Sequence, residues 1–570
     1  MPNTYAFGPF RFETRGLLTR KGKQVHLTPK EAAVLRVLLE NAGSVVEKDE
    51  FQKKVWPEIR LDIQFDNCLK RAIATLRRAL DDPKSKSLYI QTLSKLGYLF
   101  HANVTLMPEA MHARLKIVVL PFRAIARRQH PKEFIDLTED VTIQLGRLNP
   151  QRLGVIAFST ARRYKNTKKT IAQIGEELGV GYVLEGGVLR SGNRVRVSVQ
   201  LSLVTDESQL WGETYEREWK DIPVLLRELG QDVARALQVK LVSHEQARLD
   251  YVAPVVPEAY KSYLDGRYLW NKRTPESLRD AIALFEKAIA LDASFALAYS
   301  ALADCYAVIA SQSWMPPKQA CDKAKSAATK ASSFDPTLAE PHAALGFVLS
   351  VFEHDWAKAE QEFQQALRLN TNCATAHQWY SFYLAARNRL SEALQQMKLA
   401  QEIDPYSRMI KTNVGTMLYW ARDYDGAIEQ YDQALRLDSD FWYAYWMRGL
   451  AYDEKKQYRQ AAADQRRAQR YCPEQSSLLT ASLSRSLALA GDQVGARRQL
   501  KEAKAAGRST LAHYHFAVAH AALGDKDAAF RTLLESSSAH EMWVSFVQVD
   551  SKIDSLRNDR RYQELVRAIF

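Results

Sequence analysis

Two stretches in the second half of the chain, Ala393–Asp404 (ALQQMKLAQEID) and Ala427–Asp438 (AIEQYDQALRLD), decide how its larger part folds. Their first alanines are 34 residues apart, and this spacing recurs along one series: Ala359, Ala393, Ala427 and Ala461. After each member, Phe, Met, Tyr or Gln follows at four residues, a second alanine at seven, and Asn, Asp or Cys at eleven. Self-similarity at a fixed period indicates a repeat architecture.

The spacing is that of antiparallel helix pairs. Small residues at fixed positions allow two helix backbones to approach closely, the larger residue fills the space beside them, and Asp-Pro or Asn begins the next turn. The pattern resembles the tetratricopeptide repeat. Weaker copies on both sides predict an all-α superhelix of about eight repeats over residues 255–570, with an insertion near 311–318 and a terminal helix near 560–570 as its cap.

The repeat resemblance implies a concave groove that holds a protein or peptide partner and carries no chemistry. Five aromatic residues are candidates for lining this groove, with packing between helices as the favoured alternative for each: Trp379, Tyr380, Tyr443, Tyr445 and Trp446.

Positive charge concentrates at the start of the chain. The whole sequence has 79 Lys and Arg against 66 Asp and Glu, a net charge of +13. Residues 1–105 alone have 18 Lys and Arg against 11 Asp and Glu, so about +7 lies in less than a fifth of the length. Such a basic segment predicts a polyanionic partner, most simply nucleic acid.

The basic segment contains three expected helices. The first begins at Thr28-Pro29-Lys30-Glu31, where Thr is a good N-cap, Pro suits the first helical position and Glu completes a capping box. The second spans Lys48–Val55 and the third Phe65–Leu80. At about 100° per residue, the third helix has an apolar stripe opposite an arc of cations, which predicts that it lies in a DNA groove; a solvated basic face is the alternative.

The first 100 residues resemble the OmpR-type winged helix-turn-helix of bacterial regulators. The matching motifs are Leu27–Glu31, Val45-Val46, Leu76–Leu80, Ile90–Thr92 and Gly97-Tyr98, together with an opening β-sheet over Tyr5–Leu18. The resemblance implies that the third helix enters the major groove and that a hairpin around Ser94-Lys95 forms a wing at the minor groove. Carried over by position, helix contacts to DNA fall to Asn67, Lys70, Arg71, Ala74, Arg77 and Arg78, and wing contacts to Thr92, Lys95 and Tyr98.

Residues 113–247 are expected to form a small α/β domain. The pattern predicts strands at 116–122 and 154–158, helices near 136–148 and 170–178, and a long hairpin over Tyr182–Val204 that turns at Ser191-Gly192-Asn193. The segment resembles the TolB amino-terminal-like domain. A basic cluster around Arg162, Arg163 and Lys165 is either an anion contact or, as favoured, a solvated loop.

The sequence lacks the motifs that would indicate an enzyme, a cofactor or a metal. Walker A, G-x-S-x-G, H-E-x-x-H and Rossmann patterns are absent. The same middle and C-terminal arrangement accompanies class III cyclases, but no residues remain for a cyclase catalytic domain. The five cysteines are scattered and contain no C-x-x-C, which suits a reducing cytosol. We expect neither a signal peptide nor a membrane helix.

These features together resemble HilA/CadC-like transcription regulators. The resulting prediction is a multidomain protein with a winged helix (α+β) over 1–105, an α/β domain over 113–247 and the all-α repeat array over 255–570. Its function would be that of a cytoplasmic one-component regulator, with activation favoured, whose partners are double-stranded DNA, RNA polymerase and a protein or peptide in the groove. Homodimer formation stays open. The alternative is a protein–protein scaffold that binds DNA only weakly and nonspecifically.

Overall fold

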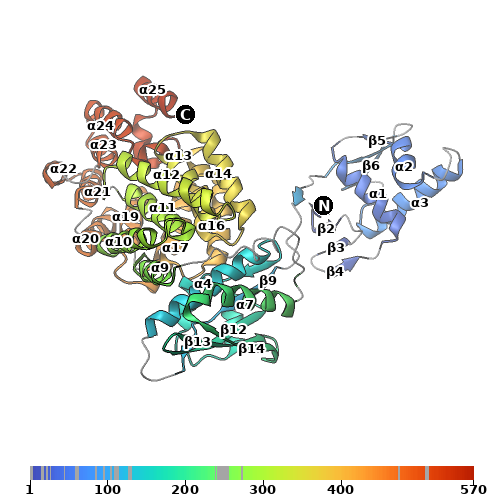
Figure 1. Cartoon of the computed structure of the whole chain (residues 1–570). Coiled ribbons are helices and arrows are strands. Elements are labelled where there is room, and N and C mark those ends of the chain that lie inside the picture. Colours follow the sequence, from blue (N-terminus) through green and yellow to red (C-terminus); the bar gives the residue numbers. More distant parts are fainter. Residues whose placement is uncertain are drawn as a thin grey trace. The chain divides into compact units, whose positions relative to one another are not determined.

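The structure is a computed structural model of the 570-residue chain. It describes residues 4–570 except 14–17, 21–22, 26, 44, 58–62, 84–86, 94–96, 103–104, 108–113, 126–130, 238, 240–255, 271–273, 313, 473–475 and 507–511. The chain divides into two compact units, Met1–Arg114 and Leu115–Phe570, which are described separately (Figure 1).

The first unit opens with an antiparallel sheet in the strand order β4-β3-β2-β1-β8. Its strands are β1 (Thr4–Phe7), β2 (Phe10–Glu13), β3 (Leu18–Arg20), β4 (Lys23–Val25) and β8 (Thr105–Met107). The last of these corrects the sequence analysis, which ended the winged-helix domain at residue 105. Strand β8 pairs with β1, Tyr5 opposite Leu106, because backbone donors at a sheet edge are satisfied by a returning strand whatever its side chains.

Three helices and a second sheet complete this unit. Helix α1 (Pro29–Glu40) has the predicted N-cap Thr28, a complete capping box with Glu31 and Pro29 at its start. Helices α2 (Lys48–Val55) and α3 (Ile63–Ala79) follow, and the sheet has the order β5-β7-β6. Its strands are β5 (Val45–Glu47), β6 (Ile90–Leu93) and β7 (Gly97–Phe100), so the hairpin predicted as the wing is present, with its turn outside the described residues.

The second unit begins with a mixed sheet in the order β11-β9-β12-β13-β14, with β10 beside β12. The predicted hairpin is formed by β12 (Tyr182–Ser191) and β13 (Arg194–Leu203), with Gly192 at φ 60° in the turn. The other strands are β9 (Leu115–Val119), β10 (Arg123–Ala124), β11 (Leu153–Val155) and β14 (Gln209–Glu218). The strand expected to reach Phe158 ends at Val155, and Phe158–Ala161 form the short helix α5.

At strand β9 both faces of this sheet are covered. Alternate residues of β9 point to opposite sides, so Ile117 and Val119 join the large core beneath α4 (Pro131–Leu148) and α7 (Ile222–Ala236). Val118 instead joins a smaller core with α5 and the predicted helix α6 (Ile171–Leu178), whose N-cap is Thr170. The middle segment is therefore a two-sided α/β layer.

The rest of the second unit is a helical array, as predicted (Figure 1). Its helices pair in chain order: α9 (Pro257–Trp270), α10 (Pro275–Leu291), α11 (Ala296–Ser311), α12 (Pro317–Phe334), α13 (Glu340–Val351), α14 (Trp356–Leu369), α15 (Ala374–Ala386), α16 (Leu390–Ile403), α17 (Arg408–Trp420), α18 (Tyr424–Leu437), α19 (Trp442–Glu454), α20 (Tyr458–Tyr471), α21 (Ser476–Leu489), α22 (Gln493–Ala506), α23 (His513–Ala522) and α24 (Lys526–Ser538).

The small residues of the repeat do what their spacing predicts. Ala393 and Ala427 are fully buried between paired helices. A Cβ atom on Gly415 would lie 2.4 Å from Cε1 of Tyr431, so the ring of the second helix occupies the space that glycine leaves on the first. The large residue of the repeat therefore fixes how close the two helices come.

The end of the chain turns back onto the array. Two short helices, η5 (Met542–Phe546) and η6 (Ser551–Leu556), precede α25 (Arg560–Ile569). The ring of Phe546 stacks on Trp420 of α17 at 4.5 Å between centroids, and the indole nitrogen of Trp356 donates to the carbonyl of Ile569 at 3.0 Å. The predicted terminal helix thus contacts α14, far earlier in the chain, as well as the last repeat.

Candidate nucleic-acid interface and enclosed groove

Helix α3 separates an apolar side from a basic one. Leu69, Ile73 and Leu76 are almost completely buried in the core of the first unit. The residues predicted to contact DNA from the other side are exposed, except Arg77, which is half-buried: Asn67, Lys70, Arg71, Ala74 and Arg78. Asp66, the acid nearest this arc, pairs with Lys48 at 2.9 Å, so its charge is balanced within the domain.

Arg77 connects the helix to the wing. Its guanidinium donates to the carbonyl of Ile90 at 2.7 Å and to the Thr92 hydroxyl at 2.9 Å. The structure therefore brings two of the predicted contact residues together, one on α3 and one on β6. Of the other two wing residues, Lys95 lies outside the described residues.

Tyr98 does not present its ring to the solvent. It is only 7% exposed, its ring packs edge-on against Phe51 at 6.1 Å between centroids, and burial raises the pKa of its hydroxyl. The resemblance led us to expect a wing contact here. The observed packing instead gives Tyr98 the role of supporting the sheet that carries the wing.

One residue that organises the wing was not identified from the sequence. Asp82, 2% exposed, follows α3 and accepts hydrogen bonds from the backbone nitrogens of Leu88, Tyr89 (3.2 Å) and Ile90 (2.8 Å). Its carboxylate thereby fixes the start of strand β6 relative to the end of helix α3. The Asp-Asp-Pro sequence after α3 is the only local signal, because Asp favours turns of this kind.

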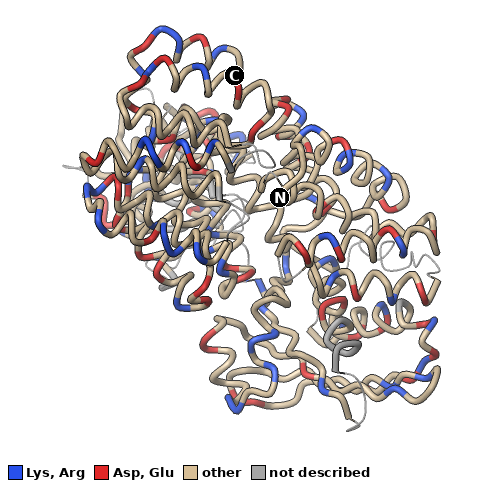
Figure 2. Tube along the Cα trace, turned by 90° about the vertical axis from the view of Figure 1, so that its left-hand side faces the viewer, with Lys and Arg blue, Asp and Glu red and all other residues tan. Residues whose placement is uncertain are grey.

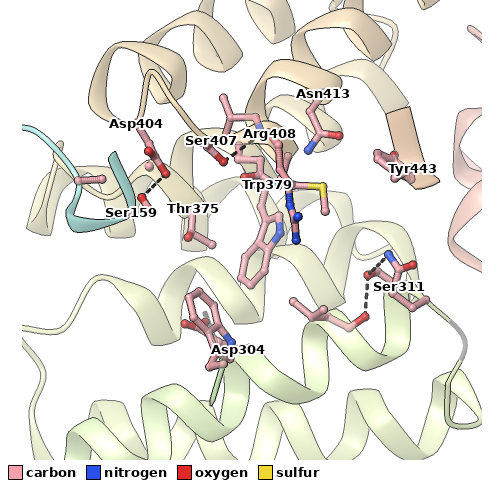
Figure 3. Close-up of a pocket in the computed structure, with 18 of the residues that line it drawn as sticks. Ser159, Asp304, Ser311, Thr375, Trp379, Asp404, Ser407, Arg408, Asn413 and Tyr443 are labelled. Atoms are coloured by element: carbon pink, nitrogen blue, oxygen red, sulfur yellow. Dashed lines mark hydrogen bonds between the residues drawn. The ribbon is translucent and has the colours of Figure 1, made fainter. Parts of the chain in front are cut away.

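The second unit encloses a cavity of about 960 Å³ on the inner side of the array (Figure 3). Helices α11, α13, α15, α17 and α19 line it together with α4 and α5 of the middle domain and Met542-Trp543. Polar and aromatic groups surround this space, among them Trp379, Arg408 and Asn413. Asn413 is 2% exposed, and its side-chain oxygen has no hydrogen-bond partner among the described residues.

The aromatic residues proposed for the groove mostly pack between helices. Trp379 stacks on Phe347 at 4.9 Å between centroids and borders the cavity with a small exposed edge. Tyr443 and Trp446 also border it, and the two others of the set, Tyr380 and Tyr445, do not line it. The alternative of inter-helix packing therefore describes most of their surface.

The basic cluster of the middle domain divides between two places. Arg162 and Arg163 border the cavity, where Arg163 lies 5.5 Å from the ring centroid of Tyr406. Burial and the neighbouring Arg162 lower the pKa of the Arg408 guanidinium. Lys169, in contrast, pairs with Glu177 at 2.5 Å on the outside. Only part of the cluster therefore faces a site.

Polar contacts fix the middle domain against the array. The Asn372 side chain, in the turn after α14, donates to the carbonyls of Gly146 (2.9 Å) and Leu153 (2.8 Å) and accepts from the nitrogen of Val155 (3.4 Å). Two turns of the array take part, because Asp404, after α16, accepts from the hydroxyls of Ser159 (2.5 Å) and Thr160 (2.7 Å).

Buried ion pairs add to these contacts. Arg147 pairs with Glu340 at 3.1 Å, and Arg267 with Glu139 at 2.5 Å, which joins α4 to α13 and α9. Burial raises the pKa of Asp140, which lies beside these pairs and accepts from the Tyr260 hydroxyl, to about 7.

The described residues bear on two other functions, metal binding and membrane insertion. No group of three or more His, Cys, Asp or Glu residues there is arranged to hold a metal ion; His513, for example, pairs with Glu541 at 2.9 Å. Nowhere in the described part of the chain does a helix combine the length and the apolar character that crossing a bilayer requires.

Four family models match the chain in the predicted order. Residues 22–100 match "Transcriptional regulatory protein, C terminal", and residues 113–229 match "HilA/YgeH-like transcriptional regulator, second domain". Residues 351–408 match "Tetratricopeptide repeat", and residues 418–456 match "TPR repeat". The middle segment, which we compared with TolB, therefore matches the second domain of HilA-type proteins.

Curated relatives match larger and smaller parts of the chain. The chain is 26% identical to the transcriptional regulator HilA of Salmonella typhimurium over 440 residues, 76% of each protein. It is 37% identical over 84 residues to the transcriptional regulatory protein KdpE of Mycobacterium tuberculosis, covering 15% of this chain and 36% of KdpE. A putative adenylate cyclase 3 of Rhizobium meliloti is 32% identical over 196 residues, covering 34% of this chain and 33% of that protein.

Proposed function

Since the chain is a HilA-like transcriptional regulator, with an OmpR-type DNA-binding domain, a HilA second domain and tetratricopeptide repeats, we propose that it activates transcription in the cytoplasm from promoters that α3 recognises. The observation that carries this proposal is the exposed arc of α3, whose cations lie opposite a buried apolar stripe while the nearby Asp66 is paired. A helix so divided fits the major groove with its basic side.

In this proposal the contact residues have different tasks. Asn67, Lys70 and Arg71 reach base edges or phosphates, Ala74 contacts a thymine methyl, and Arg78 contacts a phosphate. Arg77 and Thr92 hold the wing against α3, and their exposed sides face the phosphate backbone of the DNA. Lys95, which lies outside the described residues, supplies a phosphate contact in this proposal.

The second unit receives the signal in this proposal. A protein or peptide segment occupies this cavity, which the side chain of Asn413 and the edge of Trp379 border. Contact with RNA polymerase completes activation in this proposal. In this proposal the chain performs no catalysis, and the match to the putative adenylate cyclase covers only 33% of that protein.

Substitutions on the full chain test the reading helix. On a duplex selected from a random library, Lys70→Ala and Arg71→Ala should each weaken binding by about 1–3 kcal/mol and reduce the preference over random DNA. The control is Lys54→Ala, which removes a cation of α2 that pairs with Glu50 at 2.8 Å. If both α3 variants keep the affinity and preference of the unchanged protein, the proposed orientation of α3 is wrong.

A second experiment separates regulation from scaffolding. A chain cut after Arg114 keeps the caps, core and both sheets of the first unit, so it should fold and still select its site at about 150 mM salt. It should not respond to the signal, because the cavity is removed. A fragment that folds and binds all duplexes equally would favour the scaffold with weak, nonspecific DNA binding.

A further inference from the structure

The outer helices of the array differ sharply in charge. In α16 and α18 acids outnumber bases, with Glu392, Glu402, Asp425, Glu429 and Asp432 against Lys398 and Arg436. The next two outer helices, α20 and α22, reverse this balance. They contain eight cations and two acids: Arg459, Arg466, Arg467, Arg470, Arg497, Arg498, Lys501 and Lys504, with Asp464 and Glu502.

The cations of α20 and α22 form a stripe on each helix. At 3.6 residues per turn, Arg459, Arg466 and Arg470 lie within an arc of about 40°. Arg497, Lys501 and Lys504 lie within about 60° on α22. All six side chains are exposed, and the alanines on the opposite sides of both helices are buried. Figure 2 views the molecule from the side on which α20 and α22 lie in Figure 1, with Lys and Arg in blue.

The two acids do not neutralise these stripes. Asp464 is 2% exposed and pairs with Arg448 at 2.6 Å and with Arg467 at 3.0 Å, away from the α20 stripe. Glu502 accepts from Gln499 at 2.8 Å, outside the arc of Lys501. Among the described residues, no carboxylate forms an ion pair with any of the six stripe cations.

The excess of positive charge affects the pKa of a neighbouring histidine, His520. Lys504 lies 2.9 Å from Nε2 of His520, on α23. Burial lowers the pKa of His520, and the cations Lys504, Arg531 and Arg497 lower it further against the opposing effect of Asp525. Like charges therefore gather here, which costs stability unless an anion binds.

We propose that the stripes of α20 and α22 bind the phosphate backbone of duplex DNA outside the site read by α3. This inference rests on the proposed function, because the DNA is the promoter that α3 selects. The stripes contact phosphates only and add affinity without sequence preference.

The composition of the surface favours DNA over an acidic protein. Cations four and seven residues apart on a helix are separated by about 6 and 10 Å along its axis, a regular row suited to a regular polyanion. Protein interfaces need a central apolar or aromatic anchor, whereas the exposed residues between these cations are Gln460, Ala463, Arg467, Arg498 and Glu502, none of them aromatic or a large apolar residue. The exposed Val494 lies at the start of α22, away from the centre of the row.

The test compares three variants of the full chain. One replaces Arg459, Arg466 and Arg470 by Gln, and a second replaces Arg497, Lys501 and Lys504 by Gln. The matched control replaces Arg368, Lys398 and Arg436 by Gln; these exposed cations occupy the same repeat positions as Arg470 or Arg466 on other outer helices. Binding is measured against salt on a short duplex that holds only the selected site, and on one extended by about three helical turns on each side.

The salt slope is the slope of the logarithm of the binding constant against the logarithm of the salt concentration. Each stripe variant should reduce the size of this slope on the extended duplex by about 2 to 3, since each lost phosphate contact removes about 0.9 from it. Affinity there should fall by about tenfold or more at physiological salt, and the short duplex should bind as before. The control should match the unchanged protein on both. Replacement of Arg459, Arg466 and Arg470 by Lys should keep the slope.

An unchanged slope on the extended duplex would overturn the proposal, as would an equal loss in the control. Unchanged DNA binding combined with weaker transcription by purified polymerase would assign the stripes to an acidic protein instead. Lys70→Ala and Arg71→Ala test the role of the winged helix separately, through the preference for the selected site over random DNA. Failure of the proposed function and failure of this inference can therefore be distinguished.

Discussion

Replacing Asn372 by Ala should loosen the middle domain from the repeat array. The substitution removes three hydrogen bonds to Gly146, Leu153 and Val155 and leaves the carbonyls of two buried residues, Gly146 and Leu153, without this donor. At about 0.5–1.5 kcal/mol for each hydrogen bond, the loss should be about 2–4 kcal/mol. Because all three partners are backbone atoms at the end of α4 and in β11, no side chain there can rotate to compensate.

Hydrogen exchange on the full chain measures this effect where it arises. Amides of residues 146–156 should exchange faster in the Asn372→Ala variant, while those of α19 and α20 should not change. Asn372→Asp should destabilise at least as much, since it keeps the side-chain size but places a carboxylate against two carbonyl oxygens. The control is Asp440→Ala at the same position of a later repeat, where the carboxylate is exposed and accepts from Ser439.

The reasoning is refuted if exchange at residues 146–156 stays unchanged in the Asn372→Ala variant, or if Asn372→Asp is tolerated. Either result would mean that apolar packing alone holds the two parts together. A loss in Asp440→Ala equal to that in Asn372→Ala would instead assign the effect to the repeat turn itself.

Three further predictions concern other contacts. Arg77→Ala should lower the stability of the first unit by about 1–3 kcal/mol in urea unfolding, because it removes the hydrogen bonds to the Ile90 carbonyl and the Thr92 hydroxyl, and Arg78→Ala should change it little. Gly415→Ala should lower the melting temperature, since its Cβ would meet Tyr431 at 2.4 Å, whereas Gly230→Ala, with Leu148 at 3.5 Å, should be tolerated. Burial raises the pKa of Asp140 to about 7 from 3.8, so between these pH values the folded state keeps a proton that the unfolded state loses. The stability that the protonated Asp140 contributes is therefore lost as pH rises from about 4 to 7. Asp140→Asn should flatten this fall in the free energy of unfolding measured across the same range.

Local chemistry made much of the fold predictable. The cap at Thr28, the buried stripe around Ile73 and the turn at Gly192 each depend on residues a few positions apart. The 34-residue period predicted the array for the same reason, because a helix pair and its turn repeat within it. The apolar residues at 154–158 were ambiguous, since a short apolar run suits either a strand or a helix, and Phe158 turned out to begin one.

Other features depend on partners distant in sequence. Strand β8 forms because β1 offers an open edge about 100 residues earlier, and its own sequence gave no sign of it. The return of the chain through η5 places Phe546 on Trp420, although the segment lacks the repeat period that would have located it. Asp82 is similar, because its three backbone donors lie beyond a turn.

The repeat position eleven residues after the first alanine shows which contacts the repeat pattern alone cannot predict. Asn370 and Asp438 occupy it and accept hydrogen bonds from the nitrogens of Asn372 and Asp440, which closes their own turns. Asp404 occupies the same position but accepts from two hydroxyls of α5, about 245 residues earlier. A residue that closes its turn needs only its neighbours, whereas Asp404 is satisfied in this way only once the middle domain has formed. Substitution of Asp404 therefore tests the docking of two domains, and the same substitution at Asp438 tests the array alone.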